Sequence, residues 1–139
     1  QVLTRQARAA GKPVRGLETA EQSLAALAGL SDAAALRLLT ELIDGRAAET
    51  ASAMVTPWLA GDLAALGEGM TAKMQREEPE VFRALIVERS ARWAEQVAAL
   101  LEGDGAKLVV VGAGHLAGPE NMIDMLASRG IRFDRVPSP

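Results

Sequence analysis

The stretch KLVVVGAGHLAGP, residues 107–119, decides the expected fold because it joins a β-branched run to a glycine-rich turn. Its residues 108–111 (LVVV) are typical of a strand that is buried on both faces of a parallel sheet. Pro119 suits the first turn of a helix, and Gly130 is placed to end that helix. Residues 131–136 then supply a second strand. This order predicts one strand–helix–strand unit.

Toward the N-terminus, the sequence predicts a third strand. Residues 13–18 form it, with a proline at its first position, where a strand tolerates one. Thr19 then begins a helix, because Gln22 lies three residues further on, at the spacing of a capping box. The fold class that we predict is α/β: helix-rich, with long covering helices over a short, mostly parallel sheet whose strands lie near residues 13–18, 107–112 and 131–136.

Apolar residues recur at helical spacing in the segments between these strands. They predict a buried face on a helix over residues 19–29, on a second that begins at residue 31 or 32, and on a long helix over residues 79–101. A proline predicts a break near Thr56 in a further helical segment. The apolar positions are Leu24, Leu27, Leu36, Leu39, Leu42 and Ile43 in the first two helices, and Phe82, Leu85, Ile86, Trp93, Val97, Leu100 and Leu101 in the long one.

Length and composition restrict the class of protein. A chain of 139 residues is expected to form one domain, and its four aromatic residues leave Ala, Leu and Val to build the core. The absence of cysteine excludes disulfides, thiolate metal sites and a cysteine nucleophile. A net charge of -3, with both signs interspersed, gives no basic stripe, so we expect no nucleic-acid partner. No apolar run approaches the roughly 20 residues that span a bilayer.

Glu18 and His115 each follow the carboxyl end of a predicted strand, just ahead of a helix. Ligands bind at that edge of open α/β sheets, so these two side chains are candidates for one site, as metal ligands or acid–base groups. Each also has a purely structural interpretation. His115, the single histidine, could donate to a backbone carbonyl of its loop, and Glu18 could simply favour the positive end of the next helix.

Arg89 lies on the apolar stripe of the long helix, where a guanidinium needs an anionic partner or a route to water. Glu21, Glu88 or an oxyanion of a ligand could be that partner. A buried ion pair between helices and a role in binding are both open. We interpret Trp58 and Trp93 as core residues.

A dinucleotide site is an alternative for the glycine-rich turn. Residues 112–117 (GAGHLA) fit the pattern G-x-G-x-x-A after an apolar strand, and Asp134 follows about 20 residues on, as such a site requires. Two features disfavour this alternative. Gly118 and Pro119 delay the helix start, and a histidine inside a phosphate loop is unusual.

Four blocks of sequence occur in the order seen in the C-terminal half of one family. They are GKPVRGLETAEQ (residues 11–22), WLAGD (58–62), RSARW (89–93) and VGAGHLAGP (111–119). Together they make the chain resemble the TraB/GumN family, which includes the Tiki peptidases and, more distantly, erythromycin-esterase-like proteins. The resemblance covers essentially the whole chain. The chain differs from the family pattern at Ser90, where an asparagine is usual.

This resemblance implies a metal-dependent hydrolase, most simply a peptidase. It implies a divalent ion (Mn, Zn or Co) with His115 and Glu18 as ligands, and Glu18, Arg89 and His115 as catalytic residues. The expected substrate is a peptide or a small ester.

The resemblance further implies that residues 1–139 are the C-terminal half of a TraB/GumN-type α/β domain. The helical start of the sequence, without an initiating methionine, likewise indicates that the chain begins within a longer protein. The missing N-terminal half would then be a partner, and the fragment alone would be inactive and bind metal weakly or not at all. A homo-oligomer and an extracytoplasmic location, periplasmic or membrane-associated, are further expectations. A non-catalytic binding or regulatory module is the alternative function.

Overall fold

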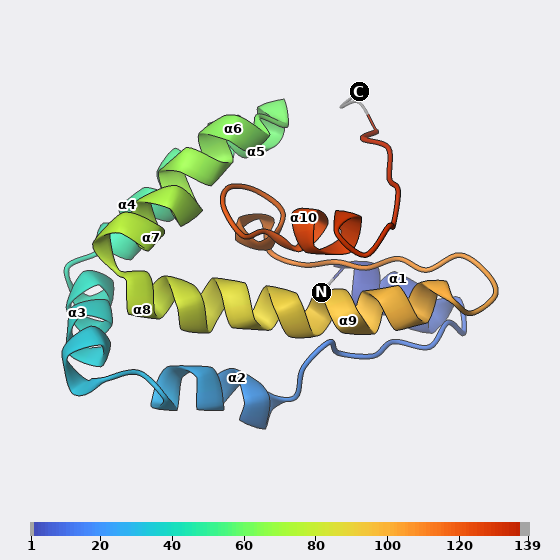
Figure 1. Cartoon of the computed structure of the whole chain (residues 1–139), viewed down its shortest axis with the longest axis horizontal. Coiled ribbons are helices and arrows are strands. Elements are labelled where there is room, and N and C mark those ends of the chain that lie inside the picture. The colour runs from blue at the N-terminus through green and yellow to red at the C-terminus, as the bar shows by residue number, and fades with distance from the viewer. Residues whose placement is uncertain (1, 137–139) are drawn as a thin grey trace.

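The computed structural model describes residues 2–136, which are arranged around one long central helix (Figure 1). α8, η2 and α9 follow one another along the chain to form it, and η2 is π-helical. α2 lies below this helix in the figure, and α10 lies above it. The helices are α1 (Val2–Ala9), α2 (Ala20–Ala28), α3 (Asp32–Ile43), α4 (Arg46–Ala53), α5 (Val55–Ala60), α6 (Leu63–Leu66), η1 (Gly67–Ala72), α7 (Lys73–Glu77), α8 (Pro79–Phe82), η2 (Arg83–Val87), α9 (Glu88–Leu101), η3 (Ala113–His115) and α10 (Met122–Ala127).

No β-strand occurs within residues 2–136, so the predicted α/β class and its parallel sheet are wrong, and the fold is all-helical. The segments at 13–18, 107–112 and 131–136 lack helical structure as expected, but they form no ladder with one another. β-branched residues favour an extended backbone locally, whereas a strand also requires the peptide groups of a neighbour. Local pattern was therefore insufficient to predict the pairing.

Several helix boundaries agree with the sequence. Thr19 and Gln22 form the predicted capping box, in which each side chain accepts a hydrogen bond from the other residue's backbone N–H. Ser31 caps α3 in the same manner, its hydroxyl accepting from the N–H of Ala34. The break in the segment that follows lies at Met54, two residues before the predicted position. A side chain that caps locally can thus be recognised without knowledge of the tertiary fold.

The main core lies between the central helix and α10. Trp93, Ala94 and Val97 of α9 pack with Met122 and Leu126 of α10, as the predicted apolar stripe requires at Trp93 and Val97. Further apolar residues pack on the edge of this cluster, including Leu17, Val109, Val111, Leu116 and Ile131. The three extended segments thus each contribute one or two side chains to the core without joining a sheet.

The buried faces predicted for the helix over residues 19–29 and for the helix that follows it, which are α2 and α3 in the structure, are wrong. Side chains that should be covered have more than two-fifths of their surface exposed, on α2 (Leu24 and Leu27) and on α3 (Leu36, Leu39, Leu42 and Ile43). Trp58 of α5, predicted as a core residue, is likewise exposed (61%). Among the described residues no single helix is long and apolar enough to cross a bilayer, although α2 and α3, bent by 109°, pass the same test as a pair.

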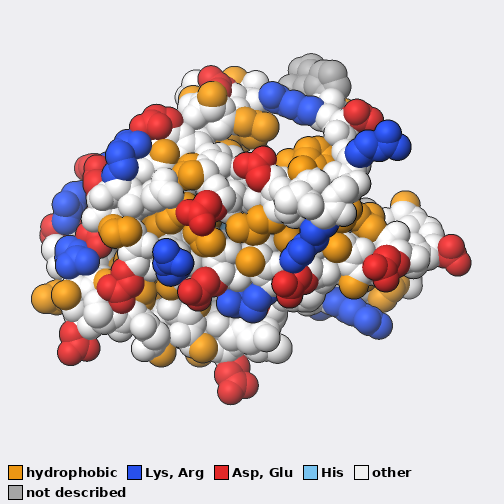
Figure 2. All heavy atoms as spheres, in the orientation of Figure 1, with side chains coloured by type: hydrophobic (Ala, Val, Ile, Leu, Met, Phe, Trp, Pro, Cys, Tyr) orange, Lys and Arg blue, Asp and Glu red, His pale blue; other side chains and the backbone are white. Residues whose placement is uncertain are grey.

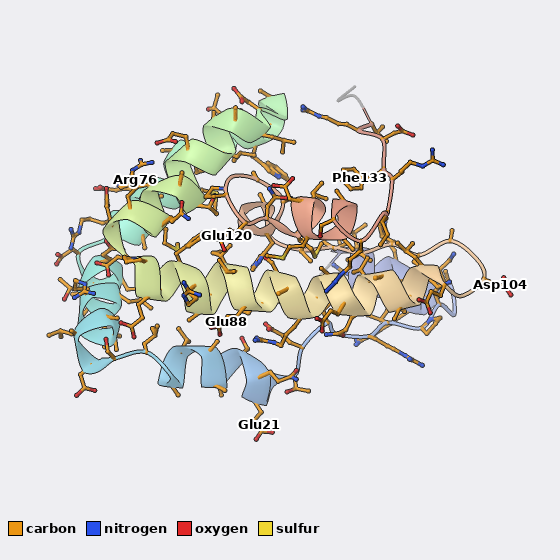
Figure 3. The ribbon with its side chains drawn as sticks, in the orientation of Figure 1. Glu21, Arg76, Glu88, Asp104, Glu120 and Phe133 are labelled. Atoms are coloured by element: carbon orange, nitrogen blue, oxygen red, sulfur yellow. The ribbon has the colours of Figure 1, made fainter. Side chains whose placement is uncertain are left out.

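Charged side chains of both signs are mixed over the visible face (Figure 2). Figure 3 shows Glu88 on the central helix, Asp104 in the loop after α9, and Phe133 on the C-terminal extended segment beyond α10. The guanidinium of Arg135, on the same segment, donates to the backbone carbonyl of Gly61, which directly follows α5. A hydrogen bond therefore links the C-terminal segment to the end of α5.

Candidate functional site

Glu18 and Arg89 form a bidentate ion pair between the segment before α2 and the central helix. Arg89 Nη2 lies 2.5 Å from Glu18 Oε1, and Nε lies 3.1 Å from Oε2. Both side chains are largely buried, with 21% of the Arg89 side chain and 15% of the Glu18 side chain exposed. Hydrogen bonds from Arg89 hold the pKa of Glu18 below its usual value. The carboxylate is therefore ionised near neutral pH, with both oxygens engaged.

The π-helical turn η2 provides a further partner for the same guanidinium. Arg89 Nη1 donates to the carbonyl oxygen of Leu85, 3.1 Å away. A π-helical turn disturbs the normal pairing of backbone carbonyls with N–H groups, and such turns occur frequently at functional sites. The guanidinium also stacks over the ring of Trp93, with its central carbon 4.7 Å from the ring centroid. Arg89 is thus fixed on three sides.

His115 contacts the Trp93 ring and forms a hydrogen bond with a serine. Its Nδ1 is 2.9 Å from the hydroxyl oxygen of Ser90, and its ring centroid is 4.5 Å from that of Trp93. Ser90 is wholly buried, and His115 is 6% exposed. The hydroxyl can donate to Nδ1 or accept from it, depending on which ring nitrogen carries the proton. Ser90 therefore fixes the orientation of the imidazole in either tautomer.

Burial is the largest influence on the charge of His115. Desolvation, the largest cause, and the positive charge of Arg89 lower its pKa to about 4, against smaller opposing effects of the Glu18 carboxylate and the backbone carbonyl of Ile86. The imidazole is consequently neutral at pH 7. A neutral imidazole can accept a proton or bind a metal, although a low pKa makes it a weak base.

Two glycines and a threonine hold the His115 loop against the central part of the chain. Gly67 of η1 approaches Gly118 so closely that a Cβ on Gly67 would lie 2.6 Å from the Gly118 nitrogen. The Thr71 hydroxyl lies 3.0 Å from the Ala117 carbonyl and 3.1 Å from that of Gly67. The loop is thus clamped between the π-helical turn η1 on one side and η2 on the other, with contacts to both.

The three sequence-predicted site residues are brought into one contiguous cluster. Arg89 contacts Glu18 directly, and Trp93 lies in contact with both Arg89 and His115. Glu18 and His115 form no hydrogen bond with each other within the described chain. The cluster also includes Ser90 and Trp93, whose roles sequence reasoning missed. The signal was available for Trp93, since it lies four residues after Arg89 on one helix face.

The indole nitrogen of Trp93 is a buried donor that has no hydrogen-bond partner among the described residues. Buried N–H groups of this kind are uncommon and costly. It belongs to the cluster formed by Glu18, Arg89, Ser90, Trp93 and His115, in which it is a buried donor without a partner.

The residues present do not by themselves fit a divalent metal. His115 and Glu18 are the two candidate ligands, and both oxygens of Glu18 are held by Arg89. No group of three or more His, Cys, Asp or Glu side chains with metal-binding geometry occurs within residues 2–136. Fewer than three protein ligands rarely retain zinc. A metal site would need Glu18 to leave its ion pair and further ligands to join His115.

The glycine-rich turn does not have the geometry of a dinucleotide site. Residues 113–115 form a short 3₁₀ turn, and the next helix begins only at Met122, capped by Asn121. Backbone N–H groups at that helix start are therefore separated from Gly112 and Gly114 by a full loop, whereas a pyrophosphate needs them directly after the glycines.

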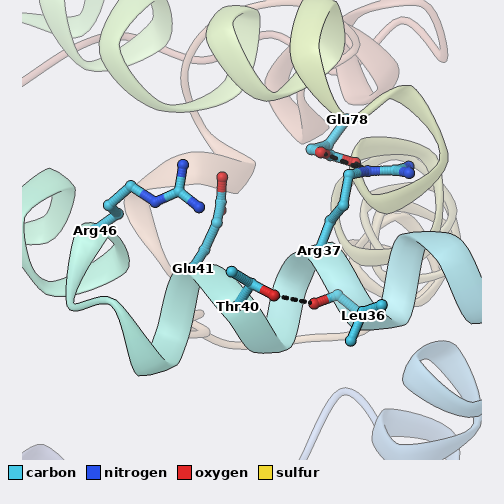
Figure 4. A pocket seen from close by; sticks show the side chains of 6 residues that line it. All are labelled: Leu36, Arg37, Thr40, Glu41, Arg46 and Glu78. Carbon is cyan, nitrogen blue, oxygen red and sulfur yellow. Dashed lines mark hydrogen bonds and ion pairs between the residues drawn. The ribbon is translucent and has the colours of Figure 1, made fainter.

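A separate pocket of about 260 Å³ lies beside α3 and α4, and no cluster residue lines it (Figure 4). Arg37 and Glu78 are paired across it, with Arg37 Nε 2.8 Å from both carboxylate oxygens. No sequence-predicted site residue lines it; the lining residues are Leu36, Arg37, Thr40, Glu41, Arg46 and Glu78.

The sequence model of the TraB/PrgY/gumN family matches residues 1–135, nearly the whole chain. No curated protein and no solved structure matches the chain.

Proposed function

Because this chain belongs to the TraB/PrgY/gumN family, we propose that it contributes His115 and Arg89 to a peptidase-like hydrolase site. The observation that carries the proposal is the contiguous cluster of Glu18, Arg89, Trp93 and His115. It combines an anion-binding group, an unpaired donor and a neutral imidazole within one small region. A cluster with these functions is what hydrolysis of a carbonyl compound requires.

Each group has a role that its contacts support. The neutral imidazole of His115, oriented by Ser90, accepts a proton from an attacking water and returns it to the leaving group. Arg89 binds a carboxylate of the substrate or the developing oxyanion, and Trp93 Nε1–H donates to the same oxygen. Glu18 holds Arg89 in place until an anionic substrate competes for the guanidinium.

The proposal includes a divalent ion (Mn, Zn or Co). The described residues of this chain do not bind such an ion without further ligands. A divalent ion would polarise the scissile carbonyl. Within the cluster, His115 is free of an ionic partner and suited to such an ion, and Glu18 is suited only after it separates from Arg89.

The test compares the full-length protein that contains this chain with its His115→Ala variant on a panel of fluorogenic peptides and a small ester, with Mn²⁺, Zn²⁺ or Co²⁺ added in turn. Arg76→Ala is the matched control, because Arg76 pairs with Glu68 on an exposed surface. We expect cleavage that falls at least about 100-fold in His115→Ala, the usual size of an acid–base contribution, and is unchanged in the control. Equal cleavage by all three proteins would remove His115 from the mechanism.

Burial favours a second candidate function, a module that binds a peptide without cleaving it. Ser90 is inaccessible to solvent, His115 is 6% exposed, and the carboxylate of Glu18 is paired with Arg89. A buried imidazole that is held by the Ser90 hydroxyl and the backbone carbonyl of Ile86 suits a structural role as well as a chemical one. Binding of the same peptides, measured by fluorescence anisotropy with no cleavage under any metal, would favour this second function.

A further inference from the structure

The Glu18 carboxylate occupies Arg89 in the way that a bound carboxylic acid would. Arg89 Nε and Nη2 lie on one edge of the guanidinium, and they donate to different oxygens of Glu18, at 3.1 and 2.5 Å. Bidentate pairing of this kind is the geometry by which arginine recognises carboxylates in general. Nη1 of the same group donates to the Leu85 carbonyl, and the Trp93 ring covers one face. A carboxylate that binds along the Nε and Nη2 edge must therefore replace Glu18.

The backbone around Glu18 is fixed independently of the ion pair. Among residues 2–136, no backbone–backbone hydrogen bond involves residues 13–18. The segment is anchored instead through Leu17, whose side chain packs on the core and whose carbonyl accepts a hydrogen bond from Gln96 Nε2, 2.7 Å away. The Glu18 side chain keeps 15% of its surface exposed. It can therefore leave Arg89 toward solvent by rotation of its own bonds, while Leu17 holds the backbone in place.

Exchange of one carboxylate for another keeps the guanidinium of Arg89 paired. Loss of Glu18 without a replacement would leave a poorly solvated positive charge, which is costly. A ligand carboxylate supplies the same two acceptor oxygens, and the displaced Glu18 side chain becomes hydrated, so the exchange avoids that cost. An uncharged ligand offers no such compensation. The pair therefore selects for an anionic group in the ligand.

We propose that Glu18 is an internal competitor for a carboxylate-binding site on Arg89, and that the ligand is a peptide whose own carboxylate displaces it. The site is closed by Glu18 in the absence of such a peptide and opens when one binds. The C-terminus of a peptide and an acidic side chain both present the required pair of oxygens. This inference rests on the proposed function, to which it adds the class of substrate and a means of regulation.

The experiment measures binding to this chain without metal. The chain contains two tryptophans, so a 15N-labelled sample gives two indole N–H signals in NMR spectra, and Trp58→Phe assigns them. Trp93 lies against Arg89, whereas Trp58 is exposed on α5. The probes are acetyl-dialanine with a free carboxylate, the same peptide as its C-terminal amide, the C-terminal amide of acetyl-alanyl-glutamate with a free side-chain carboxylate, and inorganic phosphate.

We expect a peptide carboxylate to shift the Trp93 signal and not the Trp58 signal, and the uncharged amide to shift neither. Glu18→Gln should bind the carboxylate peptide at least about tenfold more tightly, because the internal competitor is absent. Glu21→Gln is the matched control, since it removes the same charge from an exposed position of α2 that points away from the central helix (Figure 3). Its affinity should equal that of the unaltered chain. The tighter of the two carboxylate peptides identifies the source of the carboxylate.

Circular dichroism verifies that both variants are folded, and a second measurement needs no variant. In the unaltered chain, the 13C signal of the Glu18 side-chain carboxylate should move toward that of a hydrated glutamate as the peptide saturates the site. A Glu18 signal that stays constant at saturation would contradict the displacement, whatever the variants do.

Three further results would overturn the proposal. The first is that neither carboxylate peptide shifts the Trp93 signal, in the unaltered chain or in Glu18→Gln. The second is an equal change of affinity in Glu18→Gln and Glu21→Gln. The third is binding of the uncharged amide or of phosphate as tight as that of the carboxylate peptides. The proposed function fails separately, through equal cleavage by the His115→Ala protein, because the binding measurement involves neither metal nor cleavage.

Discussion

At the scale of single residues, Arg89 has the most partners in the candidate site. It binds Glu18 through two nitrogens, donates to the Leu85 carbonyl and covers the Trp93 ring. Removal of one partner from such a pair leaves the other charge poorly solvated. The guanidinium therefore contributes to stability as well as to the proposed binding of an anion.

We expect Arg89→Ala to lower the free energy of unfolding by about 2 kcal/mol, because Glu18 loses its partner and the Trp93 ring loses its cover. Arg89→Lys should recover only part of this loss, since an ammonium cannot form the bidentate pair. Urea denaturation at pH 7 measures both. Arg76→Ala, which removes an exposed pair, should show no measurable change. A similar loss in Arg76→Ala would contradict the assignment.

His115 predicts a specific dependence of stability on pH. Its pKa is about 4 in the folded protein, against 6.5 for an ordinary histidine, so the unfolded chain binds the extra proton between these two pH values. Stability from this group is thus fully present above pH 6.5 and is lost as the pH falls to 4, by up to about 3 kcal/mol. Urea denaturation of the unaltered protein and of His115→Gln, from pH 4 to 7.5, measures the difference. Parallel curves for the two proteins would show that burial does not lower the pKa of His115.

The contacts of a single residue were predictable where its side chain requires a particular kind of partner. An arginine on an apolar stripe requires an anion, and the structure supplies Glu18, which the sequence had placed in the same site on other grounds. The exposure of Trp58 was not predictable, because a tryptophan is buried only if another element covers it. The link from Ser90 to His115 joins residues 25 positions apart and depends on the tertiary fold.

At the scale of elements, the contact between η1 and the His115 loop depends on the absence of side chains. A Cβ on Gly118 would lie 2.0 Å from the Thr71 hydroxyl oxygen, and the residue has φ +80°. Gly130 has nearly the same backbone angle, φ +79°, with nothing within 4 Å of its Cβ position. The two glycines therefore differ in steric surroundings and not in backbone conformation.

We expect Gly130→Ala to cost about 1 kcal/mol, the price of a left-handed angle for a residue with a side chain. Gly118→Ala should cost clearly more, because the loop must also separate from Thr71. Thermal unfolding of both variants measures the difference. The 15N-labelled histidine gives one imidazole signal in this chain, and it should shift in Gly118→Ala only. Equal destabilisation would mean that the close approach is not rigid.

Helix caps were predictable because all their atoms lie within four residues. The capping box at Thr19 and the cap at Ser31 are examples. The strand predicted at residues 107–112 does not form, because a β-branched run favours an extended backbone and leaves open whether another segment pairs with it. The π-helical turns gave no recognisable sequence pattern either, although both lie beside the candidate site.

At the scale of the whole molecule, a large apolar area is left uncovered on α2 and α3. The apolar periodicity correctly predicted that these segments are helical. It wrongly predicted that another element covers their apolar side chains. Because Leu42 and Ile43 are 58% and 83% exposed, their apolar atoms contribute little to folding.

We expect the double substitution Leu42→Gln and Ile43→Gln to change the free energy of unfolding by no more than about 0.5 kcal/mol, as is usual for surface positions. It should also reduce binding of the dye 1-anilinonaphthalene-8-sulfonate. Val97→Ala, in the core, is the contrasting variant and should cost about 2 kcal/mol. Substantial unfolding of the double variant would show that α3 is covered in solution.

The approach of Gly67 to Gly118 has a consequence for related sequences. A Cβ on Gly67 would lie 2.6 Å from the Gly118 nitrogen, so a larger residue at position 67 forces the two segments apart. Gly118 keeps a second reason for glycine after such a separation, because its φ is +80°. Relatives that keep this crossing should therefore carry both glycines, and relatives that have lost the first should still favour glycine at the second position.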